Sequence, residues 1–365
     1  MPPPPPLRIF YASDTTPNAW FASVRSNIWR NNLYLPLVDL GHDVVEFQYD
    51  LTQTFRNLDT NDPRQAAFIA TNRPAVSAAL LEQIKAAHAV KKVDIFFSYF
   101  YDTCVLPETI DAIRRMGIKT VNWYCNGSYQ LHLVREISPH YDFCLVPEKF
   151  RLPDYRAMSA RPLYCQEAAN PAIYKPFDLP KEFDVTFVGQ AYGDRPLFIR
   201  HLLNQGITVN VWGHGWRNPH PKYMPAETFN AIVAIPESLR NDPLSDDDMV
   251  KMYSRSKINL GFSTCGNTHA AAERILQVRL RDFEVPMSGG FYLVERMDEL
   301  AEFFAEGREI ACYAGQDELA AKIKYFLAHE STRAAIAAAG HARALRDHTW
   351  QKRFQTAFAE MGLHP

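Results

Sequence analysis

The chain has 365 residues, 47% of them hydrophobic and 22% charged, a composition typical of a soluble globular protein. Because one ordinary core rarely serves a chain this long, two domains are expected. The 39 basic and 41 acidic residues are mixed along the chain and leave a net charge of −2, which argues against a nucleic-acid partner.

The N-terminal residues do not have the pattern of a targeting signal. Pro2 to Pro6 follow Met1 without a basic flank or an apolar core, so we expect residues 1–6 to form a disordered proline leader. Elsewhere the apolar runs have the length of strands, and no transmembrane segment is predicted. The six cysteines are scattered without a C-x-x-C pair. They predict reduced core thiols and a cytoplasmic protein, with no zinc site.

Residues 7–170 are predicted to form a first α/β domain. A strand at 7–12, a helix at about 23–40 and a strand at 43–47 make a β-α-β unit, which implies a parallel sheet. The same alternation continues with helices at 75–89 and 107–116 and strands at 93–98, 119–124 and 143–146. No G-x-G-x-x-G follows the first strand, so this Rossmann-type half is a poor candidate for binding NAD or FAD.

A proline-containing linker at 171–180 separates this half from a second α/β domain at 181–346. In that domain we expect strands at 184–189, 209–213, 257–262 and 291–294, and helices at 195–205, 249–256 and 317–329. Within the last segment, 347–365, a final helix is expected at 349–361. The fold class is therefore α/β with two parallel sheets.

Residues 279–295 combine cations, a carboxylate, a glycine turn and an apolar strand. We expect Arg281 to carry phosphate charge and Glu284 to face ribose hydroxyls. Arg279 would not share a helix face with Arg281, so only one of the two is expected to reach phosphate. Backbone N–H groups in the turn, from Ser288, Gly289 and Gly290, are expected to face the phosphate oxygens. The alternatives are a solvated Arg, an exposed Glu at a helix end and a plain turn.

Several segments of the second half resemble the C-terminal domain of GT-B glycosyltransferases. They are residues 184–189 (DVTFVG), 211–216 (VWGHGW) and 256–260 (SKINL), followed by the most specific part, 281–291 (RDFEVPMSGGF). Matches at 298–300 (DEL), 309–310 (EI), 317–319 (DEL) and 348–350 (HTW) keep the same order. The branch that the chain resembles most includes spore-maturation CgeB-like proteins.

The resemblance implies two Rossmann-like domains facing each other across a cleft, with the C-terminal helix crossing back to the N-terminal domain. It also implies a nucleotide-sugar donor on the C-terminal domain, an acceptor on the N-terminal domain and no metal or other cofactor. In this comparison Glu284 is the carboxylate that grips the donor ribose. Many related enzymes that retain anomeric configuration have a second Glu where this chain has Leu276, so the preference for retention is modest.

Further donor-side candidates follow the strands of the second half. Gly189, Tyr192 and Arg195 belong to a loop between a strand and a helix, where N–H groups and a cation can approach phosphate. Gly213, His214 and Trp216 follow the next strand; the two rings are candidates to border the base, although a core Trp in a turn is an equal alternative. Thr264 lies in a polar loop expected near the donor.

Candidates in the first half are selected because ligands gather at the carboxyl ends of parallel strands. For the acceptor side they are Ser13, Tyr99, Tyr101 and Asn126, with core packing as the alternative for the aromatic rings. For a general base they are Asp14, Asp102 and His132.

The sequence favours a glycosyltransferase that moves a sugar from a nucleoside-diphosphate donor to an unidentified acceptor. One alternative is a nucleotide-sugar 2-epimerase of the same fold. Another is a non-catalytic protein that binds carbohydrate or nucleotide.

Overall fold

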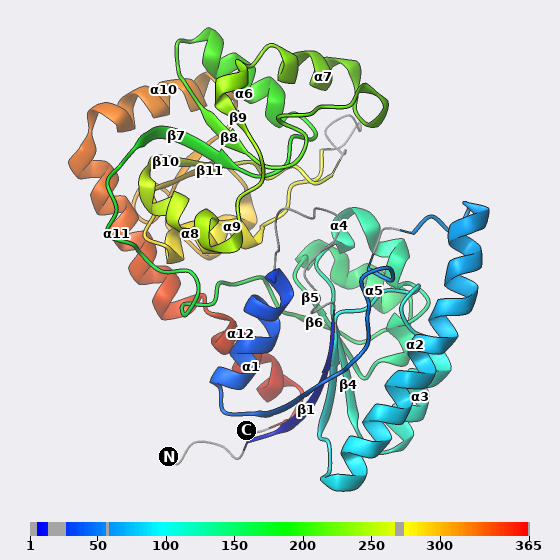
Figure 1. Ribbon diagram of the computed structural model, residues 1–365. Helices are drawn as coiled ribbons and strands as arrows, with labels where there is room; N and C mark the ends of the chain where they lie inside the picture. The colour runs from blue at the N-terminus through cyan, green and yellow to red at the C-terminus, as the bar shows by residue number, and fades with distance from the viewer. Residues whose placement is uncertain (1–5, 14–26, 56–57, 267–273, 364–365) are drawn as a thin grey trace. The chain divides into compact units, whose positions relative to one another are not determined.

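The computed structural model describes residues 6–13, 27–55, 58–266 and 274–363. The chain divides into two compact units (Figure 1). Unit 1 comprises Met1–Gln166 and Trp350–Pro365, and unit 2 comprises Glu167–Thr349. Each unit contains a six-stranded sheet in which all paired strands are parallel. The predicted fold class, α/β with two parallel sheets, is confirmed.

The sheet of unit 1 has the order β2-β1-β3-β4-β5-β6. Its strands are β1 (Arg8–Ala12), β2 (Asp43–Glu46), β3 (Ile95–Ser98), β4 (Lys119–Trp123), β5 (Phe143–Val146) and β6 (Pro162–Tyr164). The helices of this unit are η1 (Arg30–Tyr34), α1 (Leu35–Asp39), α2 (Pro63–Val90), α3 (Pro107–Arg115), α4 (Gly127–Gln130), η2 (Leu131–Val134), η3 (Ser138–His140), η4 (Lys149–Arg151), α5 (Leu152–Ala157) and α12 (Trp350–Glu360). Helix α1 packs beside α12, and α2 packs beside α3.

Helix α2 is longer than its sequence pattern indicated. We expected a helix only over about residues 75–89. In the structure the helix begins at Pro63. The side chain of the preceding residue, Asp62, accepts hydrogen bonds from the N–H groups of Arg64 and Gln65. Pro74 lies inside the helix. This N-terminal cap and a proline at the first helical position are what fix the start.

The C-terminal helix α12 belongs to unit 1, as expected of a helix that returns to the N-terminal domain. Trp350 is fully buried, and its indole N–H donates to Oδ1 of Asn32 at 3.0 Å. Phe354 packs edge-on against Phe97 of β3, with ring centroids 5.6 Å apart. These contacts join residues more than 250 positions apart into one core.

Unit 2 has the strand order β12-β11-β10-β7-β8-β9. Its strands are β7 (Phe183–Val188), β8 (Asn210–Trp212), β9 (Arg240–Asn241), β10 (Ser256–Gly261), β11 (Tyr292–Glu295) and β12 (Ala311–Tyr313). Its helices are α6 (Arg195–Asn204), η5 (Pro221–Tyr223), α7 (Ala226–Val233), η6 (Glu237–Leu239), α8 (Asp246–Arg255), α9 (Leu280–Met287), η8 (Asp298–Glu302), α10 (Gln316–Ala328) and α11 (Glu330–Asp347).

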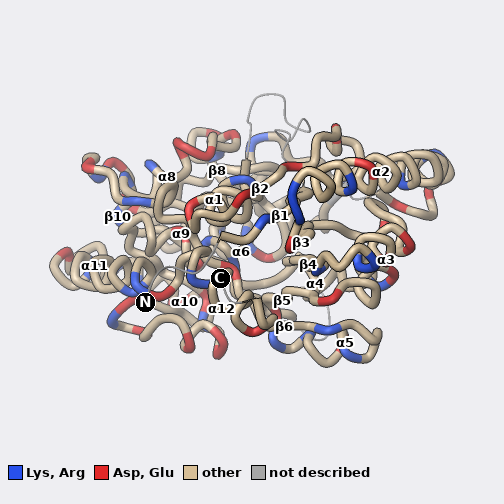
Figure 2. Tube along the Cα trace, turned by 90° about the horizontal axis from the view of Figure 1, so that it is seen from below, with Lys and Arg blue, Asp and Glu red and all other residues tan. Residues whose placement is uncertain are grey.

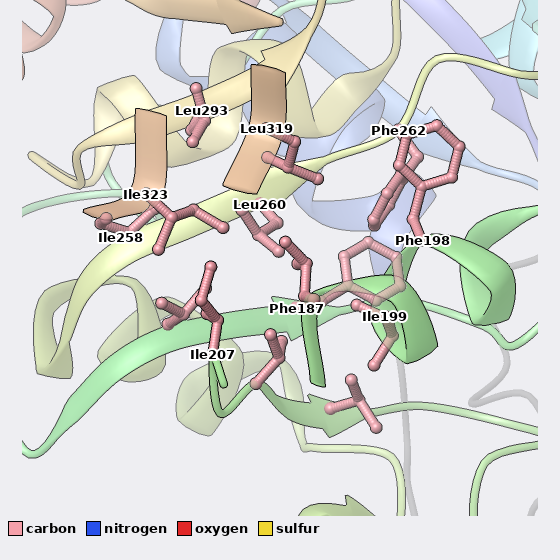
Figure 3. Close-up of a cluster of buried hydrophobic side chains, with 14 of the residues drawn as sticks. Phe187, Phe198, Ile199, Ile207, Ile258, Leu260, Phe262, Leu293, Leu319 and Ile323 are labelled. Atoms are coloured by element: carbon pink, nitrogen blue, oxygen red, sulfur yellow. The ribbon is translucent and has the colours of Figure 1, made fainter. Parts of the chain in front are cut away.

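The core of unit 2 lies between the sheet and helices α6 and α10 (Figure 3). Phe187, Leu260 and Leu293 project from three neighbouring strands toward Ile199 of α6 and Ile323 of α10. All five side chains are buried. Alternating apolar residues on the strands and the apolar stripe of each helix therefore fix the layers of this unit.

All six cysteines lie within the described residues, are buried and form no disulfide, as the cysteine pattern predicted. Figure 2 shows Lys and Arg interspersed with Asp and Glu along the trace. Among the helices that the structure describes, none combines the length and the apolar character needed to cross a membrane.

Candidate functional site

The candidate site of unit 2 lies where β7 and β10 pair side by side. From β7 the chain moves to β8 on one side, whereas from β10 it moves to β11 on the other. In open parallel sheets, ligands bind at the carboxyl ends of strands at such a switch point. The segments that follow these strands are residues 189–194 and 262–266, so the predicted donor residues Gly189, Tyr192 and Thr264 all lie here.

Glycine allows the loops after β7 and β8 to touch. Gly213 has φ +143°, and a Cβ at this position would stand 2.2 Å from the carbonyl oxygen of Gly189. The same carbonyl accepts the indole N–H of Trp216 at 2.7 Å. On the other side of the loop, a Cβ on Gly189 would lie 3.1 Å from Nη1 of Arg281. Gly213 therefore lets the two loops touch, and Gly189 leaves room for the Phe187 ring and the Arg281 guanidinium.

Arg195, the first residue of α6, is 4% exposed. It donates hydrogen bonds to the Gln190 carbonyl at 3.1 Å and to Oη of Tyr192 at 2.8 Å. Its Nε has no hydrogen-bond partner among the described residues. Burial lowers the pKa of Arg195 to about 10, and the charges of Arg279 and Arg281 act in the same direction.

Arg279 immediately precedes α9 in extended conformation, so it does not lie on the helix with Arg281 as the sequence suggested. Its backbone N–H donates to the carboxylate of Asp282 at 2.8 Å. Its guanidinium donates to the carbonyl of Thr264, while its Nε has no partner within the described chain. This side chain is thereby held beside the end of β10.

Arg281, on the first turn of α9, is half-buried. Its Nε donates to Oη of Tyr253 at 3.4 Å. No ion pair joins Arg195, Arg279 or Arg281 to a carboxylate in the part of the chain that the structure describes. The carboxylate of Glu284 does act electrostatically on Arg281. Three guanidinium groups thus gather where α6 begins, an environment that favours an anion.

Glu284 lies on α9 and is 3% exposed. Burial raises the pKa of its carboxyl, whereas the charge of Arg281 and a hydrogen bond from Tyr174 lower it. The alternative of an exposed glutamate at a helix end is therefore wrong. Contact with a ribose stays a prediction for this residue.

The glycine turn does not form the predicted phosphate cradle. The N–H groups of Ser288, Gly289 and Gly290 donate to the carbonyls of Glu284, Pro286 and Val285 at 3.0, 2.9 and 3.0 Å. These bonds satisfy the last carbonyls of α9, and Gly289 has the φ of +70° that such a helix end requires. The three N–H groups are consequently used within the protein and do not face an anion.

Trp216 is not available to border a nucleotide base. It is fully buried and packs edge-on against Phe187, with ring centroids 6.1 Å apart. The core alternative is therefore correct for this residue. His214 is half-buried, and burial lowers the pKa of its imidazole.

An ion-pair group beside the arginines was missed from the sequence. Arg274 pairs with Asp194, which precedes α6, and at 2.5 Å with Glu295 at the end of β11. Glu295 is 3% exposed and accepts the N–H of Ser263 at 3.0 Å. Ligands gather at the carboxyl ends of parallel strands, so the position of Glu295 at the end of a predicted strand would have selected it as a candidate. Thr264, in the same region, is buried, and its hydroxyl has no partner among the described residues.

In unit 1, the structure brings two predicted base candidates together. Asp102 and His132 line one cavity of about 510 Å³. Burial raises the pKa of Asp102 to about 6. Its carboxylate accepts the N–H groups of Glu136 and Ile137 at 3.2 and 3.1 Å. The third candidate, Asp14, lies outside the described residues.

The other first-half candidates lie apart from this cavity wall. Tyr99 and Tyr101 are 4% and 8% exposed and pack within an aromatic cluster, so neither ring offers a free face to a sugar. Core packing explains them. Asn126 is half-buried and accepts a hydrogen bond from Tyr129 at 3.4 Å. Ser13, at the end of β1, is buried, and its hydroxyl has no partner among the described residues.

Residues 195–359 match a family model described as glycosyl transferase-like. No curated protein sequence matches the chain. The matched residues contain Arg195, Arg279, Arg281 and Glu284.

Solved structures resemble the whole chain. Sucrose-phosphate synthase from Thermosynechococcus elongatus has a TM-score of 0.63 at 14% identity, covering 98% of this chain and 99% of the other. HepE from Anabaena in complex with UDP has a TM-score of 0.58 at 11% identity, with 98% and 99% covered. A putative UDP-N-acetylglucosamine 2-epimerase from Listeria monocytogenes has a TM-score of 0.54 at 12% identity, with 98% of each chain covered.

At these identities the similarity concerns the fold. The two parallel six-stranded sheets with their helices match the GT-B glycosyltransferase fold that the sequence resemblance implied. The CgeB-like branch stays a prediction.

Proposed function

We propose that the protein is a glycosyltransferase that uses a nucleoside-diphosphate sugar as donor. The observation that carries this proposal is the group of three guanidiniums, Arg195, Arg279 and Arg281, that have no ion pair among the described residues. A diphosphate would give these guanidiniums the direct charge-assisted hydrogen bonds that no carboxylate among the described residues makes to them, and guanidinium N–H groups match phosphate oxygens geometrically. The glycosyl transferase-like match over the same residues adds to this support.

The arginines would act on the bond that breaks. When the bond between the anomeric carbon and the diphosphate oxygen opens, the electron pair leaves with the diphosphate. An acceptor oxygen forms the new bond to the anomeric carbon, and its proton passes to an oxygen of the departing diphosphate or to a base. Fixed positive charge stabilises the negative charge that develops on the leaving group. For this reason we propose transfer without a metal ion, and, from the family resemblance, transfer with retention.

In this proposal Glu284, on α9, binds the ribose hydroxyls. Arg281 lies between that carboxylate and the phosphates, and its positive charge reduces the repulsion between them. The UDP and UDP-glucose present in the HepE structures make uracil the first base to test. Six buried cysteines without a disulfide are in keeping with a cytoplasmic location, which is likewise proposed.

Incubation of the full chain with nucleotide sugars in the absence of acceptor tests the reaction. UDP-glucose, UDP-N-acetylglucosamine, GDP-mannose and ADP-glucose would each be followed by proton NMR. The proposal expects slow release of nucleoside diphosphate and free sugar from one of them. An epimerised donor would instead indicate the 2-epimerase alternative. Binding without turnover, even after candidate acceptors are added, would indicate a non-catalytic binding protein.

A further inference from the structure

The cavity that contains Asp102 and His132 lies in unit 1, among segments that follow β2, β3 and β4 along the chain. Residues 58–61 line it from the segment after β2 and Asp102 and Thr103 from the segment after β3. The region around η2, after β4, contributes Gln130, His132, Leu133 and Glu136. Its volume of about 510 Å³ is within the range of small-molecule sites. This cavity is formed entirely within unit 1.

The charge of the lining has one sign. Asp59, Asp102 and Glu136 contribute carboxylates, and the described lining contains no Lys or Arg. Arg73 reaches Glu136 with an ion pair of 3.1 Å, but it is not part of the lining. The remaining groups include hydroxyl, amide and imidazole side chains. A phosphate or carboxylate placed here would meet like charge at short range in a partly buried site.

Thr103 offers an unused hydrogen-bonding group. The residue is 7% exposed, and its hydroxyl oxygen has no partner among the described residues. A buried hydroxyl without a partner costs stability that a bound ligand can recover. Asp102, next in the chain, is fixed in place by the N–H groups of Glu136 and Ile137. The cavity thus combines a rigid acceptor with a hydroxyl that lacks a partner.

We infer that this cavity binds the acceptor, and that the acceptor is a neutral or amine-bearing saccharide without phosphate or carboxylate groups. Several hydroxyl, amide and carboxylate groups converging on one cavity are suited to a polyhydroxylated ligand. The carboxylates of Asp59 and Asp102, which have no ion pair among the described residues, add attraction for an ammonium group, and Glu136 adds less because Arg73 pairs with it. That the bound saccharide is the acceptor rests on the proposed function. The binding selectivity follows from unit 1 alone.

Ligand-observed NMR with the full chain, in the absence of nucleotide, tests this inference. The probes are methyl α-glucoside, glucosamine and glucose 6-phosphate. We expect the first two to bind, with glucosamine the tighter, and glucose 6-phosphate to bind more weakly than either. Equal or tighter binding of glucose 6-phosphate would overturn the inference, as would the absence of binding by the other two.

Two substitutions locate the binding. Thr103→Val keeps the side-chain shape and is expected to weaken binding about fivefold, the effect of one hydrogen bond. Thr71→Val, on the exposed side of α2, is the matched control. Glu136→Gln should reduce the preference for glucosamine over methyl α-glucoside, whereas Glu82→Gln, also exposed on α2, should not. Unchanged affinity in Thr103→Val together with an unchanged preference in Glu136→Gln would contradict binding in this cavity.

UDP binding is measured in parallel by calorimetry, because it distinguishes failure of the cavity inference from failure of the proposed function. If UDP binds and no saccharide does, the cavity inference is wrong and the proposed function stands. If saccharides bind with the expected selectivity and no nucleotide does, the cavity is a saccharide site but the proposed transfer reaction is wrong.

Discussion

Arg195 donates a hydrogen bond from Nη2 to Oη of Tyr192 at 2.8 Å, and its guanidinium carbon lies 3.9 Å from the centroid of the same ring. The aromatic face and the Gln190 carbonyl hold a buried cation in one orientation. Its Nε is left without a partner among the described residues. A side chain fixed in this way loses little entropy when an anion binds.

Arg195→Met should weaken nucleoside-diphosphate binding by roughly tenfold to a hundredfold, because charge-assisted hydrogen bonds contribute about 1.5–3 kcal/mol. The free energy of unfolding should change little, since the cost of burying the charge is removed with the bonds. Calorimetric titration with UDP measures the first and urea denaturation the second. Arg200→Met, at an exposed position of the same helix, is the control and should bind as the native chain does.

Glu284→Gln tests contact with the ribose. If the carboxylate binds ribose hydroxyls, the native chain should bind UDP more tightly than 2′-deoxy-UDP, and the variant should lose most of this difference. We expect a coupling of about 1–2 kcal/mol in the thermodynamic cycle of protein and ligand changes. A variant that keeps the native difference between the two nucleotides would remove Glu284 from the ribose site.

Gly213→Ala should be strongly destabilising. The new Cβ would approach the Gly189 carbonyl oxygen to 2.2 Å in a backbone conformation with φ +143°. Gly206→Ala is a matched control, because Gly206 also has positive φ (+74°) but nothing lies within 4 Å of its Cβ position. We expect the control to lose about 1 kcal/mol of unfolding free energy and Gly213→Ala at least about 2 kcal/mol more. Equal losses in urea denaturation would show that the close approach of the two loops is not required.

Asp102→Asn should change how stability depends on pH. Burial raises the pKa of Asp102 from 3.8 to about 6 in the folded chain, so the folded state holds this proton more tightly than the unfolded state. The contribution is fully present below pH 3.8 and is lost as pH rises through about 6. Relative to Asp102→Asn, the native chain should therefore lose stability from about pH 4 to just above pH 6, and little more above that range. A stability difference independent of pH would mean that Asp102 has an ordinary pKa.

The sequence predicted those parts of the fold that follow from local periodicity. The β-α-β order, the parallel sheets and the C-terminal helix all rest on alternating apolar runs between glycine and proline signals, and these were confirmed. Helix α2 was predicted too short: only residues 75–89 were expected, whereas the cap at Asp62 sets the true start. Helix α11 (Glu330–Asp347) was not predicted, since its alanine-rich sequence has little apolar contrast between its faces.

The candidate site was predictable only in its residue types. Arg195, Arg279 and Arg281 were all named, but their convergence depends on the pairing of β7 with β10, which no local pattern specifies. The prediction that the N–H groups of residues 288–290 face phosphate failed. A glycine turn after a helix has the same sequence pattern whether its N–H groups face a ligand or the carbonyls of the helix itself. Trp216 illustrates the corresponding difficulty for aromatic residues, since its burial depends on Phe187 from a different strand.

A thermal-shift titration across nucleoside diphosphates and their sugars tests the central claim most directly. A ligand at a hundredfold excess over its Kd adds about 2.7 kcal/mol to the stability of the folded chain. We predict that one nucleoside diphosphate, with UDP tested first, raises the melting temperature, that its monophosphate raises it less, and that Arg195→Met abolishes the difference while Arg200→Met keeps it. If no nucleoside diphosphate or nucleotide sugar shifts the melting temperature of the native chain, the arginine group is not a donor site.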